Sequence, residues 1–228
     1  MHKEERLSNE VLEAVIMDMD GTMIDTEPLH EAALYEALRK VGLDSRQVVI
    51  EELWGLSVNA SVPVMRKWYG EKFDAEDYLR IFRGELRRTL STKSIPMKTG
   101  VVEFLDRMQQ AGLDLAVASS SDRSTIDLSL AQVGLSGYFS QFVGGDEVEH
   151  GKPAPDIFLK AAEQLGVSPQ ACLVVEDSPP GVAAASRAGM HVYWVPDGHM
   201  PNDPDCSQAK GVYRDLHEAL AAVEAWLF

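Results

Sequence analysis

The chain has 228 residues, of which 45% are hydrophobic, and its formal net charge is −15 at pH 7. This charge excludes nonspecific binding to nucleic acids and adhesion to anionic membranes, because both surfaces are strongly negative. No apolar run approaches the length of a membrane span, and residues 1–10 lack the apolar segment of a secretory signal. We therefore expect a cytoplasmic protein, and a monomer. Its two cysteines, Cys172 and Cys206, offer no zinc-site spacing, and a disulfide is not expected in this compartment.

The first predicted strand ends in two carboxylates. An apolar run at residues 15–17 reads as a strand buried on both faces, and Asp18 and Asp20 follow it. In an extended chain these two side chains point to the same side, where their charges repel each other. A divalent cation such as Mg²⁺ would remove that repulsion, and a carboxylate can also act as a nucleophile or move a proton. The alternative is a strand end whose solvated acidic residues enter a turn.

A helical segment follows. Pro28 suits the first turn of a helix, and apolar residues recur at helical spacing until Gly42. Residues 44–94 keep this helical character, and no strand pattern occurs between residues 24 and 96. We interpret residues 25–95 as a helical cap domain inserted into a catalytic core formed by residues 1–24 and 96–228.

Strands and helices alternate after residue 96. The pattern predicts strands at 113–118, 142–143, 172–175 and 192–195. Helices are expected at 101–110, from about 126 to 133, and at 156–165, 181–188 and 216–227. This alternation predicts an α/β fold, a Rossmann-like parallel sheet with helices on both faces.

Polar side chains follow the predicted strands at their carboxyl ends, the edge at which parallel sheets bind ligands. They are Ser119, Asp146, Glu176 and Asp177, and Lys152 lies in a nearby Pro-rich loop. A phosphoryl-transfer site needs a cation, a fixed positive side chain and hydroxyl or N–H donors. Lys152 and the pair Ser119 and Ser120 would supply the last two. Taken singly, Lys152 reads as a solvated lysine, while Ser119 and the Glu176–Asp177 pair read as helix caps.

Four motifs in order resemble the haloacid dehalogenase superfamily, in its phosphatase and phosphomutase branch with a helical cap. They are Asp-Met-Asp-Gly-Thr at residues 18–22, Ser119 after a strand, Lys152 within Gly-Lys-Pro-Ala-Pro-Asp, and Glu-Asp-Ser at residues 176–178. Residues 24–30 also resemble the entry into the cap of the β-phosphoglucomutase-like subgroup. The similarity covers nearly the whole chain.

The resemblance implies a role for each matching residue. Asp18 attacks phosphorus and becomes an aspartyl-phosphate, and Asp20 protonates the leaving oxygen and then activates water. Asp18, Asp177 and Asp20, the last through its backbone carbonyl, hold Mg²⁺, with Glu176 as a further ligand or just outside. Ser119, Ser120 and Lys152 bind the phosphoryl group. In the cap, Glu27, His30 and Trp54 are candidate substrate contacts, although His30 also reads as a packed or surface residue and Trp54 as a core residue.

The resemblance implies a Mg²⁺-dependent phosphatase that hydrolyses a small phosphomonoester, such as a sugar phosphate, through an aspartyl-phosphate. A β-phosphoglucomutase-like mutase is the alternative, but the mutases carry an arginine where Val58 stands and a basic residue where Asp122 stands. Hydrolysis is therefore favoured over mutation. A dehalogenase fits less well, because that chemistry does not need Asp20. A different class, a non-catalytic phosphoacceptor domain, would lack both the helical insertion and Asp20.

Overall fold

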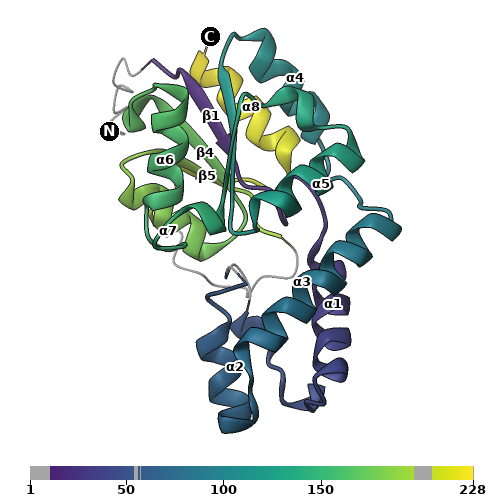
Figure 1. The fold of residues 1–228 in the computed structure, drawn as a ribbon. Coiled ribbons are helices and arrows are strands. Elements are labelled where there is room, and N and C mark those ends of the chain that lie inside the picture. The colour runs from purple at the N-terminus through teal and green to yellow at the C-terminus, as the bar shows by residue number, and fades with distance from the viewer. Residues whose placement is uncertain (1–10, 54–55, 57, 198–206, 228) are drawn as a thin grey trace.

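The computed structural model describes residues 11–53, 56, 58–197 and 207–227. These residues contain a six-stranded sheet in the order β3-β2-β1-β4-β5-β6, in which every pair is parallel (Figure 1). The strands are β1 (Ala14–Met17), β2 (Asp114–Ser119), β3 (Gln141–Gly144), β4 (Cys172–Glu176), β5 (His191–Trp194) and β6 (Gly211–Val212). The first strand thus lies between β2 and β4, with its carboxyl end near the middle of the sheet edge.

Helices cover both faces of the sheet. Helices α4 (Val101–Gln110), α5 (Arg123–Val133) and α8 (Leu216–Leu227) lie on one face, and α6 (Asp156–Leu165) and α7 (Pro179–Arg187) on the other (Figure 1). Because side chains alternate along a strand, Val15 and Met17 pack into the first face and Ile16 into the second. The predicted Rossmann-like fold is confirmed.

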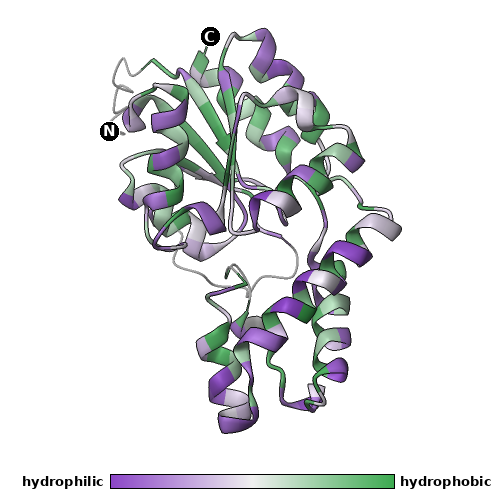
Figure 2. Cartoon of the chain, in the orientation of Figure 1, coloured by the Kyte–Doolittle hydropathy of each residue, from purple (hydrophilic) through white to green (hydrophobic). Residues whose placement is uncertain are grey.

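Three further helices lie beyond the carboxyl ends of the strands, at the bottom of Figure 1. They are α1 (Glu27–Lys40), α2 (Val62–Tyr69) and α3 (Ala75–Thr92). The buried faces of α1 and α3 pack together, and the ammonium of Lys40 donates a 2.5 Å hydrogen bond to Glu85. Figure 2 shows hydrophilic residues on the outward turns of these helices and hydrophobic residues along the sheet. Among the described residues, no helix is both long and apolar enough to cross a membrane.

Two details differ from the sequence-based expectation. Strand β1 ends at Met17, so Asp18 and Asp20 follow the strand rather than end it, although both side chains line the same cavity; the chain then turns at Gly21, whose φ is +83°. Strand β6 was not expected, because two residues are too few to show any alternation. Trp54 and Cys206 lie outside the described residues.

Candidate active site

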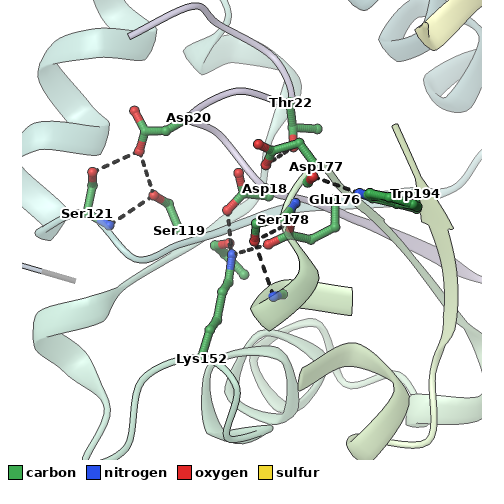
Figure 3. A network of polar contacts seen from close by, with 12 residues as sticks. Asp18, Asp20, Thr22, Ser119, Ser121, Lys152, Glu176, Asp177, Ser178 and Trp194 are labelled. Atoms are coloured by element: carbon green, nitrogen blue, oxygen red, sulfur yellow. Dashed lines mark hydrogen bonds and ion pairs between the residues drawn. The ribbon is translucent and has the colours of Figure 1, made fainter. Parts of the chain in front are cut away.

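A buried ion-pair network lies at the end of β1. The ammonium of Lys152, from the loop before α6, donates hydrogen bonds to Asp18 Oδ1 at 2.5 Å and to Glu176 Oε1 at 2.7 Å (Figure 3). Asp18 follows β1, and Glu176 is the last residue of β4, so neighbouring parallel strands bring both carboxylates to one edge. All three side chains are at most 6% exposed. Lys152 is therefore a fixed cation.

Burial and charge act differently on these groups. Burial favours the neutral form of Lys152, but the carboxylates of Asp18 and Glu176 outweigh it and raise the lysine pKa above its ordinary value. Burial raises the pKa of Asp18 well above its usual range; Lys152 opposes this, and the charge of Glu176 adds to it. The pKa of Asp177 is raised for the same main reason, burial, with Glu176 and Asp18 contributing. The single ammonium of Lys152 therefore does not balance the charge of three ionised carboxylates, Asp18, Glu176 and Asp177.

A divalent cation would remove this imbalance. Asp18, Glu176 and Asp177 each offer an oxygen, and these atoms lie within 4.8 Å of one another. The hydroxyl of Thr22 donates to Asp177 Oδ1 at 3.1 Å, and a Cβ on Gly21 would stand 2.3 Å from Asp177 Oδ2, so this carboxylate is closely held. Carboxylate oxygens are the ligands that Mg²⁺ prefers, so the donor set fits that ion. Glu176 Oε2 already accepts hydrogen bonds from Ser178, which suits a place just outside the ligand shell.

Asp20 faces a different group of side chains. Its Oδ2 accepts hydrogen bonds from the hydroxyls of Ser119 at 3.1 Å and Ser121 at 2.8 Å (Figure 3). Its Oδ1 accepts one from Thr26 at 2.5 Å, and His30 Nε2 lies 3.7 Å from the same oxygen. Asp20 therefore links the end of β2 to the start of α1.

A single cavity joins these groups. It has a volume of about 900 Å³, counting its mouth toward solvent. Asp18, Asp20, Ser119, Ser120, Lys152 and Asp177 line one end. Residues of the helical segment, among them Glu27 and His30, line the other. The cavity thus lies between the sheet edge and helices α1 and α3.

The structure brings most of the sequence-predicted residues together. Glu176 does not line the cavity, although it contacts Lys152. The cluster of carboxylates that could hold a metal consists of Asp18, Glu176 and Asp177, and it does not include the side chain of Asp20. Sequence reasoning missed Ser121 and Thr26 as partners of Asp20, and Thr22 as a partner of Asp177. The run of three serines after β2 and the threonine that ends the first motif were the available signals.

Comparisons with known proteins place the chain among phosphatases and their relatives. A family model described as haloacid dehalogenase-like hydrolase matches residues 15–195. The "phosphorylated carbohydrates phosphatase" of Thermotoga maritima is 33% identical over 185 residues, 81% of this chain and 85% of that protein. Protein CbbY of Rhodobacter capsulatus is 31% identical over 217 residues, 91% of this chain and 95% of the relative. The crystal structure of CbbY from Rhodobacter sphaeroides with phosphate has a TM-score of 0.83 at 24% identity and covers 91% of this chain and 96% of that chain, which shows a shared fold.

Proposed function

The chain belongs to the haloacid dehalogenase-like hydrolase family, and from this we propose that it is a Mg²⁺-dependent phosphatase that hydrolyses a small phosphomonoester through an aspartyl-phosphate. The observation that carries the proposal is the meeting of Asp18, Asp20, Lys152 and Asp177 at one end of a single cavity. The names of the relatives support a phosphorylated metabolite as substrate, and phosphorylated carbohydrates are the first class to test.

Asp18 is the proposed nucleophile. A carboxylate oxygen of Asp18 forms a bond to phosphorus while the bond from phosphorus to the substrate oxygen breaks. Lys152 lies beside Asp18 and would neutralise charge on the transferring phosphoryl oxygens. Because Glu176 accepts a second hydrogen bond from the same ammonium, the lysine is held in place before substrate enters.

Asp20 is the proposed proton carrier. The departing oxygen takes a proton from the carboxyl of Asp20, and the resulting carboxylate then accepts a proton from the water that attacks the aspartyl-phosphate. Inorganic phosphate leaves and Asp18 is regenerated. The hydroxyls of Ser119, Ser121 and Thr26 position the Asp20 carboxyl beside the cavity.

Mg²⁺ would be held by Asp18 and Asp177 together with the backbone carbonyl of Asp20, with Glu176 nearby. When bound, it would offset negative charge on the phosphoryl group and on the nucleophile as they approach. Residues 25–95 would act as a cap domain over the site, with hinges near residues 22–27 and 95–100. Closure of this cap would exclude bulk water during the first transfer.

The test is phosphate release from a panel of phosphorylated metabolites, with and without Mg²⁺. Mg²⁺-dependent release from at least one phosphomonoester supports the proposal, and no release from any of them overturns it. A mutase is the second candidate because the subgroup includes phosphomutases. With β-glucose 1-phosphate, free phosphate indicates hydrolysis and glucose 6-phosphate indicates mutation. Hydrolysis is favoured because Val58, on the cavity wall, carries no charge that could hold a bisphosphate intermediate.

A further inference from the structure

The far end of the cavity differs chemically from the end that holds the acidic cluster. Its described lining is mainly apolar, with Leu34 of α1, Phe82 of α3 and, between these helices, Ile50, Leu53, Leu56 and Val58; Ser61 and Tyr78 add two hydroxyl groups. Leu34 and Phe82 are buried, at 4% and 7% exposure. An apolar wall contributes to binding only when apolar surface of the ligand covers it.

The charged side chains around the cavity are mostly negative. Glu27 and Glu31 join Asp18, Asp20 and Asp177 in the lining, whereas Lys152 supplies the one cationic side chain among the described lining residues. That lysine is already bound by Asp18 and Glu176.

Arg83 is a candidate for a further cation, but its guanidinium already donates hydrogen bonds. Arg83 of α3 donates hydrogen bonds to Asp122 and to Asn59, and it does not line the cavity. A phosphate group at the far end of the substrate would therefore meet hydrocarbon, the hydroxyl-bearing residues Ser61 and Tyr78, and the carboxylates of Glu27 and Glu31, with no cationic side chain among the described lining residues there. Such like-charge contacts reject a ligand more effectively than missing contacts do.

Building on the proposed phosphatase activity, we infer that the substrate is a monophosphate whose alcohol portion has a broad apolar or aromatic face and carries no second phosphate. The phosphoryl group binds at Asp18 and Lys152, and the apolar face of the alcohol packs on the wall formed by Leu34, Leu53 and Phe82.

Both parts of the inference, the apolar face of the alcohol and the absence of a second phosphate, are tested by measuring kcat/KM for phosphate release by the wild-type protein with Mg²⁺. 2-Phenylethyl phosphate should exceed glycerol 3-phosphate by at least about tenfold, since each buried methylene is worth about fourfold. Glucose 6-phosphate should exceed glucose 1,6-bisphosphate by at least about thirtyfold, the effect of one like-charge pair about 8 Å apart at an effective dielectric constant of about 20.

A substitution then locates the charge effect. Val58→Arg places a cation on the wall and should raise the ratio of bisphosphate to monophosphate kcat/KM by at least about tenfold. Val49→Arg is the matched control, because Val49 is 45% exposed on the same segment and does not line the cavity; its ratio should stay that of the wild type. Circular dichroism checks that both variants fold.

The outcomes separate the two proposals. If monoesters are hydrolysed but glycerol 3-phosphate or the bisphosphate is preferred, the inference about the alcohol is wrong and the phosphatase proposal stands. If a folded Val58→Arg protein keeps the wild-type ratio, the wall does not face the far end of the substrate and the inference is wrong. If no phosphomonoester is hydrolysed, the proposed function fails and the inference fails with it.

Discussion

The guanidinium of Arg83 in α3 donates a 2.8 Å hydrogen bond to the carboxylate of Asp122, the residue that precedes α5. The same guanidinium donates to Asn59 at 2.9 Å, so it ties two parts of the helical segment to the sheet-bearing part. Asp122 follows Ser121, whose hydroxyl donates to Asp20. The ion pair therefore connects the proposed cap to the segment that positions the proposed acid.

Removing this ion pair should affect KM more than kcat. Arg83→Ala breaks a pair whose side chains are 40% and 18% exposed, which corresponds to at most about 1 kcal/mol. We expect KM to rise about three- to fivefold and kcat to change less than about twofold, because the open cap gains population. Arg80→Ala is the control, since Arg80 pairs with Asp77 within α3. An unchanged KM in Arg83→Ala would contradict the idea that this ion pair holds the proposed cap closed. A KM that stays high in the charge-swapped Arg83→Glu/Asp122→Arg protein would contradict it as well.

Asp18→Asn should abolish turnover. An amide oxygen is a poor nucleophile and cannot form the aspartyl-phosphate, so we expect phosphate release to fall by about 10⁴-fold or more. Asp114→Asn, an exposed position at the start of β2, is the matched control and should keep full activity. Activity of the Asp18→Asn protein above about a hundredth of wild type would remove Asp18 from the mechanism.

Lys152→Met should destabilise the fold as well as inactivate the site. It leaves Asp18 and Glu176 buried together without their cation, which typically costs about 3–5 kcal/mol of unfolding free energy. The double variant Lys152→Met/Glu176→Gln removes one of the stranded charges and should recover part of that loss while staying inactive. Urea unfolding measures the stability of these two variants and of Glu176→Gln alone, and additive losses in the double variant would show that the two side chains are not coupled.

Mg²⁺ should stabilise the protein more at higher pH. The pKa values of Asp18 and Asp177 are raised in the folded protein, mainly by burial, above the value of about 3.9 in unfolded chains. These two groups therefore favour folding at pH below about 4, and this contribution is lost as the pH rises through their folded pKa values. Mg²⁺ needs both groups ionised, so its stabilising effect should grow over the same range.

The measurement is the melting temperature with Mg²⁺ and with EDTA between pH 5 and pH 8. We expect the difference between the two conditions to widen toward pH 8 and to vanish in Asp177→Asn at every pH. A constant difference across the range, or one retained in Asp177→Asn, would place the bound cation elsewhere.

Gly21→Ala should disrupt the acidic cluster specifically. The added Cβ would stand 2.3 Å from Asp177 Oδ2, at a φ of +83° that disfavours any L side chain. Gly112→Ala is a matched control, because its φ is +77° and nothing lies within 4 Å of a Cβ added there. Both variants should lose about 1 kcal/mol of unfolding free energy from backbone strain, and Gly21→Ala should lose more because its Cβ displaces Asp177; the Mg²⁺-dependent rise in melting temperature should disappear in Gly21→Ala alone. Equal Mg²⁺ responses in the two variants would contradict a close fit around Asp177.

The alternation of apolar and polar segments and the positions of the polar residues predicted the sheet and the residues at its carboxyl edge. Alternating strands and helices gave the parallel sheet, and because parallel strands share one carboxyl edge, Asp18, Ser119 and Glu176 could be expected together. Lys152 needed the motif around it, since a loop lysine alone carries no signal.

The remaining features depend on how the loops fold. Ser121 and Thr26 reach Asp20 because the chain turns after Met17 and again after Ser119, and single hydroxyls leave no periodic trace in a sequence. Strand β6 is formed by pairing with β5 and has no pattern of its own. The apolar wall of the cavity could not be predicted either, because residues of an ordinary hydrophobic core show the same helical spacing as Leu34 and Phe82.

The central place of β1 has a consequence for how the protein is made. Ala14 lies opposite Asp114 on one side and opposite Cys172 on the other, so the strand leaves the ribosome long before either neighbour exists. Helices α1, α2 and α3 are synthesised in that interval, while the strand that precedes the proposed nucleophile has no partner. In refolding of the whole chain the same separation in sequence delays the pairing of β1, so phosphate release should recover later than helix formation, and a time course that follows both signals would register the lag.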